Sequence, residues 1–147
     1  MVYITSDHGG FQLKGDLMHF MAENEIEYED LGAYELVPDD DYTEYVLKMV
    51  ERVRYNEGAF GVAICRNGVG VSMLANKFKG IRCALSWNPN HAVSSRIDDN
   101  SNVLALGADY TFSDQAKDIL KKWLETKTSE AERHKRRLDK VGFYGQE

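Results

Sequence analysis

Two short segments of this sequence combine reactive side chains with glycine. Asp7 and His8 stand directly before two glycines, and Cys65 stands directly before the run RNGVG at 66–70. Carboxylate, imidazole and thiolate groups can each move a proton. Glycines between a strand and a helix let backbone N–H groups point at an anion or at a developing oxyanion. The two segments therefore predict a site that transfers a proton and stabilises negative charge.

Each of these residues also has a structural interpretation. Asp7 can cap the first helix through its side chain, and Cys65 can be an inert residue at the end of a buried strand. His8, beside Asp7 at the mouth of a crevice, is consistent with either role. Cys65 precedes an N–H-rich loop, which is where a thiolate would be stabilised. The Gly-x-Gly spacing matches neither a P-loop nor a dinucleotide fingerprint. A nucleotide-binding or phosphoacceptor module built on Asp7 is disfavoured, because the chain lacks a P-loop lysine and an acidic cluster at the first strand.

Short apolar runs alternate with amphipathic segments and must position these residues. The pattern predicts an α/β, Rossmann-like three-layer sandwich with a five-stranded parallel sheet and helices on both faces. We expect residues 1–147 to form one domain. Ligands in such sheets bind outside the carboxyl ends of the strands, here the loops 6–10, 65–70, 86–91 and 107–110. The expected strands are 2–5, 26–31, 60–65, 81–85 and 102–106, and the expected helices lie near 11–25, 45–53, 70–77, 91–97, 116–124 and 131–141.

Composition and charge exclude several classes of protein. The chain has 147 residues, two cysteines, 24 acidic and 18 basic residues, which disfavours a disulfide scaffold and a nucleic-acid partner. No apolar run approaches the roughly 18 residues that span a membrane, and Asp7 and His8 come too early for a signal peptide. We therefore expect a cytoplasmic protein with no membrane partner.

The charge is unevenly distributed. Residues 1–50 hold 12 acidic and two basic residues, whereas residues 51–147 hold 12 acidic and 16 basic residues. We expect most of the acids between 23 and 44 to form a solvated surface. The basic stretch at 133–140 is either a solvated helix face or a small anion site.

Taken together, these segments resemble the ribose 5-phosphate isomerase B family and its galactose 6-phosphate isomerase relatives. The resemblance covers nearly the whole chain and rests on several long motifs in the right order. These are SDHGGF at 6–11, GVGVS at 68–72, ANK at 75–77, GIRCAL at 80–85, NVLALGA at 102–108 and RHKRR at 133–137.

The resemblance implies an aldose–ketose isomerase that acts on a sugar phosphate, with ribose 5-phosphate as the family default. It implies no metal and no organic cofactor. The residue matching Cys65 is the base that moves a proton between C1 and C2 through a cis-enediolate. Backbone amides of the following loop hold the enediolate oxygens, and Ser72 supports that loop. The loop residues concerned are Arg66, Asn67, Gly68, Val69 and Gly70.

The resemblance also implies how the rest of the substrate is bound. His8, Arg133 and Arg137 match residues that hold the phosphate, and arginine suits this role because its planar fork donates two parallel bonds. Asp7 and Tyr42 match residues that contact sugar hydroxyls. The family forms homodimers, possibly paired into dimers of dimers, with shared active sites. The C-terminal helix at about 129–141 is therefore expected to pack on the partner subunit.

Several positions depart from the family pattern. Arg66 and Asn67 stand where the family has glycine and threonine, and Asp109 stands where it commonly has arginine. Asp98 and Asp99 replace a histidine–asparagine pair whose histidine opens the furanose ring; Thr43, after Tyr42, replaces a proline.

Two hypotheses follow from these departures. Positive charge has moved from position 109 to Arg66, and Asp98 serves as the ring-opening acid–base group. His91, two helical turns before Asp98, either assists it or simply begins a helix. The departures also leave two functions open: an active isomerase using Cys65 on a pentose or hexose phosphate, or a weak or silent relative. Such a relative would bind a sugar phosphate or pair with a paralogous subunit.

Overall fold

In residues 1–144, which the computed structural model describes, five strands form one fully parallel sheet in the order β2-β1-β3-β5-β4. The central strands β1, β3 and β5 are buried along almost their whole length, as expected when helices cover both faces of a sheet. The strands are β1 (Val2–Ser6), β2 (Tyr28–Asp30), β3 (Phe60–Cys65), β4 (Cys83–Leu85) and β5 (Val103–Gly107).

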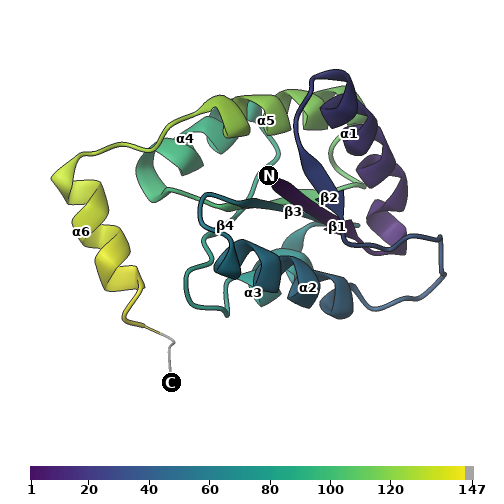
Figure 1. Cartoon of the computed structure of the whole chain (residues 1–147), viewed down its shortest axis with the longest axis horizontal. Helices are drawn as coiled ribbons and strands as arrows, with labels where there is room; N and C mark the ends of the chain where they lie inside the picture. Colours follow the sequence, from purple (N-terminus) through teal and green to yellow (C-terminus); the bar gives the residue numbers. More distant parts are fainter. Residues whose placement is uncertain (145–147) are drawn as a thin grey trace.

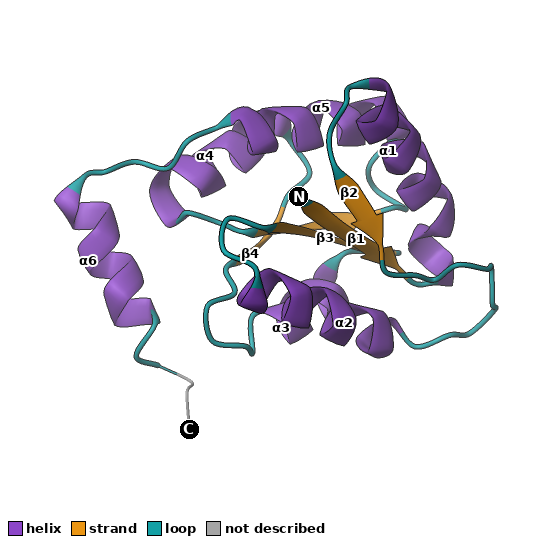
Figure 2. Cartoon of the chain, in the orientation of Figure 1, coloured by secondary structure: helices purple, strands orange, loops and turns teal. Residues whose placement is uncertain are grey.

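Alternate residues of the central strands point into two hydrophobic layers. Ile4, Ile64 and Leu104 pack with α1, α4 and α5 on one face. Tyr3 and Ala63 pack with α2 and α3 on the other face. Figures 1 and 2 show the sheet between these two groups of helices, which confirms the predicted three-layer α/β architecture. The helices are α1 (Phe11–Glu23), α2 (Tyr42–Tyr55), α3 (Val69–Ala75), α4 (Pro89–Asp99) and α5 (Ser113–Glu125), and a 3-10 turn, η1 (His8–Gly10), precedes α1.

The two outer strands are shorter than the apolar pattern predicts. Ile26 donates its N–H to the carbonyl of Met21 and thereby closes α1 instead of pairing in the sheet. Ile81 donates in the same way to Phe78 and closes a turn. The expected strands 26–31 and 81–85 were therefore each two residues too long at the start, because these isoleucines are apolar without belonging to a ladder.

The last helix, α6 (Glu132–Val141), stands apart from the sheet at the left of Figure 1. It contacts the rest of the fold mainly through α4, and within α6 only His134 is buried. No helix within residues 1–144 is long and apolar enough to span a membrane.

Candidate active site

The carboxyl ends of β1 and β3 lie side by side, with Ser6 in register with Ile64. The helix that follows β1 and the helix that follows β3 cover opposite faces of the sheet, so the connections diverge at this point. Open α/β sheets bind ligands at such a switch point. The arrangement brings the Asp7–His8 segment next to the loop that follows Cys65.

Cys65 sits at the end of β3 with its sulfur turned toward the following loop. The backbone N–H of Gly68 donates to Sγ at 3.2 Å, and Sγ lies 3.8 Å from Oδ1 of Asn67. The same Oδ1 accepts the N–H of Val69 at 3.0 Å. The N–H groups of Gly68 and Val69, both expected to face an oxyanion, therefore already have acceptors. Gly70 lies in the first turn of α3, where backbone N–H groups have no acceptor within the helix.

Glycine at two loop positions permits close backbone approach. Gly68 has φ +75°, and a Cβ there would lie 2.9 Å from the carbonyl carbon of Leu106. The loop after β3 can therefore touch the end of β5 backbone to backbone. A Cβ at Gly70 would lie 2.7 Å from the Tyr42 hydroxyl. Tyr42, at the start of α2, is thus brought against the glycine loop. Ser72 lies instead beside the Cys83 thiol, and burial raises the pKa of Cys83 to about 12.

Asp7 has the structural role that its position allowed. Its side-chain oxygen accepts the N–H of Gly10 at 3.1 Å and caps η1. Only 6% of Asp7 is exposed, and burial raises the pKa of its carboxyl. The same residue lies at the switch point beside His8, so capping and a place in the crevice are compatible.

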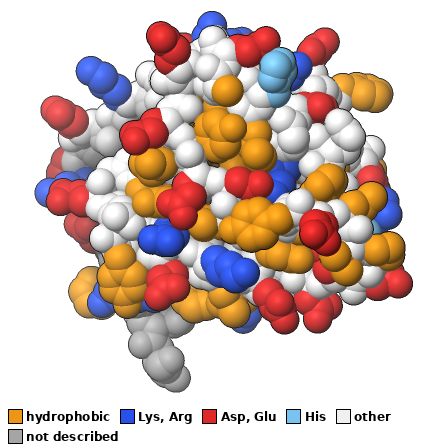
Figure 3. Space-filling view, turned by 45° about the vertical axis from the view of Figure 1, so that its right-hand side comes forward, with side chains coloured by type: hydrophobic (Ala, Val, Ile, Leu, Met, Phe, Trp, Pro, Cys, Tyr) orange, Lys and Arg blue, Asp and Glu red, His pale blue; other side chains and the backbone are white. Residues whose placement is uncertain are grey.

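His8 is held by a residue that the sequence analysis missed. Oδ1 of Asp40 accepts the backbone N–H of His8 at 2.8 Å and lies 2.6 Å from Nδ1 of its ring. Asp40 belongs to the acidic stretch expected to be solvated, and that expectation is wrong for it and for Asp30, which pairs with buried Lys14 at 2.6 Å. No sequence signal separates Asp40 from its acidic neighbours. On the face shown in Figure 3, acidic, basic and apolar side chains are intermixed.

Among residues 1–144, Asp7, His8 and Asp40 form a group that could offer ligands to a metal ion. One donor atom from each lies within 4.8 Å of the others. His8 Nδ1 and Asp40 Oδ1, however, are already joined by a short hydrogen bond. The arrangement is therefore that of a carboxylate–imidazole pair with a second carboxylate beside it.

Arg66 and Asp109, two of the departures from the family pattern, contact one another. Arg66 Nη1 lies 3.6 Å from Asp109 Oδ1, and the N–H of Asp109 donates to the carbonyl of Arg66 at 2.9 Å. The Arg66 side chain also runs over Gly9, because a Cβ at position 9 would collide with its Cγ. The guanidinium therefore lies at the mouth of the crevice, between the β1 and β5 loops.

The remaining candidate residues are not brought to this crevice. Asp98, on α4, lies 3.7 Å from the His134 ring on α6. Arg133 and Arg137 are exposed on α6, which Figure 1 shows apart from the end of β1. His91 lies in the first turn of α4, where its Nδ1 lies 3.0 Å from Ser86 Oγ.

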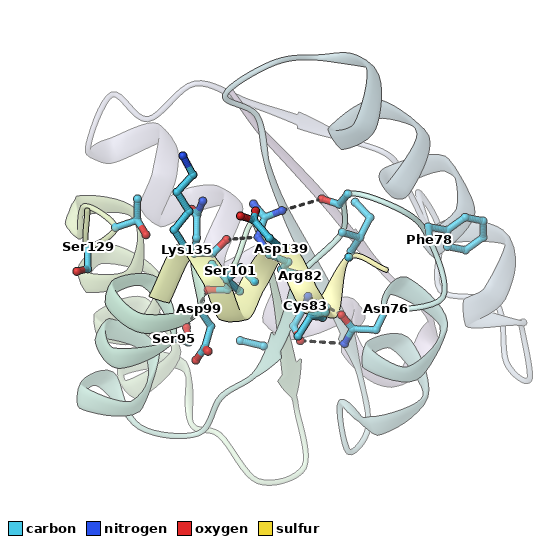
Figure 4. A pocket seen from close by; sticks show the side chains of 18 of the residues that line it. Asn76, Phe78, Arg82, Cys83, Ser95, Asp99, Ser101, Ser129, Lys135 and Asp139 are labelled. Carbon is cyan, nitrogen blue, oxygen red and sulfur yellow. Dashed lines mark hydrogen bonds between the residues drawn. The ribbon is translucent and has the colours of Figure 1, made fainter. Parts of the chain in front are cut away.

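A cavity of about 1100 Å³ lies between α6 and the β4 edge of the sheet. Arg82, Asp99 and Lys135 line it, and Figure 4 shows these side chains around one space. No residue of the segments 7–10 or 65–72 contributes to this cavity. Asp99 therefore faces α6, separate from the Cys65 crevice of the same chain.

Comparison with known proteins identifies the family and supports the fold. Residues 2–141 match the family described as ribose/galactose isomerase. The chain belongs to the ribose/galactose isomerase family. The resemblance seen in the sequence, and with it the class of enzyme, is thereby confirmed.

Individual members of this family resemble the chain over nearly its full length. Ribose-5-phosphate isomerase B of Mycobacterium tuberculosis is 31% identical over 143 residues, which are 97% of this chain and 88% of the relative. A ribose 5-phosphate isomerase from Thermotoga maritima superposes with a TM-score of 0.93 at 34% identity, covering 97% of each chain. The Mycoplasma genitalium ribose-5-phosphate isomerase B, solved with bound ribulose-5-phosphate, has a TM-score of 0.93 at 33% identity and covers 99% of this chain and 96% of its own.

Proposed function

We propose that this chain interconverts an aldose phosphate and a ketose phosphate, with ribose 5-phosphate and ribulose 5-phosphate as the first pair to test. The observation that carries the proposal is the position of Cys65. Its sulfur receives the Gly68 N–H at 3.2 Å, at the loop that faces Asp7 and His8 across the β1–β3 switch point. The relative from Mycoplasma genitalium, with ribulose-5-phosphate bound, supports this choice of substrate.

The proposed chemistry is a proton transfer between neighbouring carbons. The Cys65 thiolate removes the proton from C2 of the open-chain aldose, and the C–H electrons move into the C1–C2 bond while the carbonyl oxygen becomes an enediolate oxygen. The N–H of Gly70, in the first turn of α3, stabilises this charge, because those of Gly68 and Val69 already bind Cys65 and Asn67. The thiol then returns its proton to C1, and the proton of the C2 hydroxyl moves to the oxygen on C1, which leaves a hydroxyl on C1 and the ketone on C2. The reaction consumes nothing, and we propose that no metal or organic cofactor takes part.

We propose that a second copy of the chain completes each crevice. Arg133 and Arg137 are exposed and lie apart from His8 of their own chain. The end of α6 and the turn that follows it also expose apolar side chains, among them Val141 at 64% and Phe143 at 83%. Docking of this helix on a second copy would bury these groups and bring its arginines to the substrate phosphate opposite His8.

We propose that the residues that depart from the family pattern open the sugar ring and bind the sugar. Asp98 can exchange a proton with the ring oxygen if it reaches the crevice of a second copy together with α6, which it already contacts through His134. Asn67 hydrogen-bonds but cannot relay a proton as a hydroxyl does, so it orients substrate. Asp99 accepts hydrogen bonds from sugar hydroxyls, whereas Asp109 holds the Arg66 guanidinium at the mouth of the crevice.

Turnover by the purified protein tests this function. We would incubate it with ribose 5-phosphate and, separately, with galactose 6-phosphate, and follow ketose formation by ¹³C NMR, with Cys65→Ala as the control. Ketose formation from either sugar that stops in Cys65→Ala supports the proposal. Failure of both sugars with folded protein overturns it and favours a silent relative, which a repeat with a paralogous subunit would identify.

A further inference from the structure

Asp40 holds His8 by both its backbone and its ring. A single oxygen, Oδ1, accepts the backbone N–H at 2.8 Å and lies 2.6 Å from Nδ1. The Asp40 side chain is only 7% exposed, and that of His8 is 23% exposed. Two bonds to one buried acceptor fix the rotation of the imidazole. Because Nδ1 faces Asp40, Nε2 is the ring nitrogen left to face a ligand.

The loop that carries Asp40 is anchored to β1. Thr5 Oγ1 donates to the carbonyl of Gly32 at 2.8 Å, and the N–H of Ala33 donates to the carbonyl of Ser6 at 2.8 Å. Buried Lys14 pairs with Asp30 at the start of the same loop. These bonds begin the loop beside the end of β1, and its far end returns over His8. The Asp40 carboxylate is therefore carried by a loop whose start is hydrogen-bonded to β1.

The charges around His8 favour an ionised Asp40. Burial by itself would raise the pKa of Asp40, but the hydrogen bonds from His8 outweigh it, so that its pKa lies below the usual value. Its second oxygen, Oδ2, is buried and has no hydrogen-bond partner among residues 1–144. The other groups facing this pair are Asp7, whose pKa burial raises, and Tyr45 of α2, whose pKa burial and the neighbouring Asp40 raise. The Arg66 side chain crosses Gly9, next to His8 in the chain, while its guanidinium lies beside Asp109.

We propose that Asp40 is a positioning residue that orients His8 so that Nδ1–H points into the protein and Nε2 points to the substrate phosphate. An ionised carboxylate can only accept, so Nδ1 is the donor in the 2.6 Å contact. A protonated imidazole then has one further N–H, on Nε2, to donate to an anion. The inference rests on the proposed function, because it assigns the phosphate to His8.

Three variants test the role of Asp40. Asp40→Ala removes the acceptor and the charge, Asp40→Asn keeps an acceptor and removes the charge, and Asp39→Asn is the matched control on an exposed neighbour. We expect KM for the sugar phosphate, and the inhibition constant of inorganic phosphate, to rise about tenfold in Asp40→Ala and less in Asp40→Asn, as for a lost hydrogen bond to a charged group. The turnover number should change little, because the phosphate is bound equally in ground and transition states. Asp39→Asn should change neither constant.

A readout independent of activity completes the test. ¹⁵N NMR of the histidine rings should show the Nδ1-protonated form for His8 in the native chain and its loss in Asp40→Ala. An unchanged ring state, or unchanged KM and phosphate inhibition in both Asp40 variants, overturns the proposal; if Asp40→Ala does not fold, Asp40→Asn decides. If the native chain itself shows no turnover, the proposed function has failed, and the ring state together with phosphate-induced NMR shifts still tests the role of Asp40.

Discussion

The Arg66 guanidinium lies 3.6 Å from the Asp109 carboxylate, so two residues that depart from the family pattern face one another at the mouth of the crevice. The exposed fractions of their side chains are 63% and 47%. Exposed pairs of this kind contribute about 0–1 kcal/mol to folding. The pair therefore stabilises the fold little, and the position of Arg66 over Gly9 makes it a candidate for binding substrate.

Replacing Arg66 should weaken substrate binding more than it weakens the fold. We expect Arg66→Ala to raise KM for the sugar phosphate about tenfold, the effect of losing about 1.4 kcal/mol of binding free energy. Thermal unfolding should change little, for the reason given above. Steady-state kinetics with Arg54→Ala, an exposed arginine on α2, provides the control for loss of a surface charge. An unchanged KM in Arg66→Ala would show that the guanidinium does not bind substrate.

Replacing Asp109 should lower KM, the opposite of the effect expected for Arg66→Ala. Asp109→Asn releases the guanidinium from a competing carboxylate and removes a negative charge near the phosphorylated substrate. We expect KM to fall about twofold to threefold, in the range of an exposed ion pair. The same kinetic assay checks this, and a higher KM would mean that Asp109 itself binds the sugar.

Mixing two inactive variants should restore activity if the crevice is shared. One variant carries Cys65→Ala, and the other carries Arg133→Ala with Arg137→Ala. In a two-fold dimer of one chain of each kind, one crevice has both an intact cysteine and intact arginines, so random exchange should recover about one quarter of native activity. The measurement is turnover after mixing and subunit exchange. No recovery, with exchange shown by native mass spectrometry, would place the arginines and the cysteine in the same chain.

Replacing Asp98 should lower turnover only for substrates that form a closed sugar ring. Asp98→Asn is expected to lower turnover of ribose 5-phosphate about a hundredfold, the lower end of general acid–base contributions. It should spare erythrose 4-phosphate, whose phosphorylated O4 cannot close a furanose ring. Asp114→Asn, on the exposed start of α5, is the control. Equal losses on both substrates would remove Asp98 from ring opening.

The Asp40–His8 contact should make stability depend on acid pH. The pKa of Asp40 is lower in the folded protein than its ordinary value of 3.8, so its contribution is complete above about pH 3.8 and is lost as the pH falls through the folded value. We expect Asp40→Asn to lower the free energy of unfolding by about 1 kcal/mol at pH 7. Denaturant titrations should show this difference shrinking below pH 3.8. A difference that grew in acid would contradict the assignment.

The sequence predicts the central part of the fold because its signal there is strong. The run FGVAIC at 60–65 and the apolar residues 103–106 have no polar alternation, as buried parallel strands require. Ile26 and Ile81 misled the same reasoning, since apolar residues next to an outer strand can close turns instead. The order of strands β3, β5 and β4 follows from the way the chain crosses over, which local patterns do not encode.

The sequence predicts the site residues that directly follow strands. It misses the residue that a long loop brings back to the site. Asp7, His8 and Cys65 follow directly from the ends of strands. Asp40 lies in an acidic loop, and only the path of that loop distinguishes it from its exposed neighbours. The contact between Arg66 and Asp109 depends on the adjacency of β3 and β5. Each charge was evident in the sequence, but their pairing was not.

The most direct test of the proposed mechanism compares the two cysteines of the chain. We expect Cys65→Ser to lower the turnover number for ribose 5-phosphate by about 10²–10⁴-fold, the contribution of a general base, with KM nearly unchanged. Cys83→Ser should keep native turnover, because burial raises the pKa of Cys83 to about 12 and its thiol stays protonated. Native turnover in Cys65→Ser, or equal losses in both variants, would contradict the assignment of Cys65 as the base.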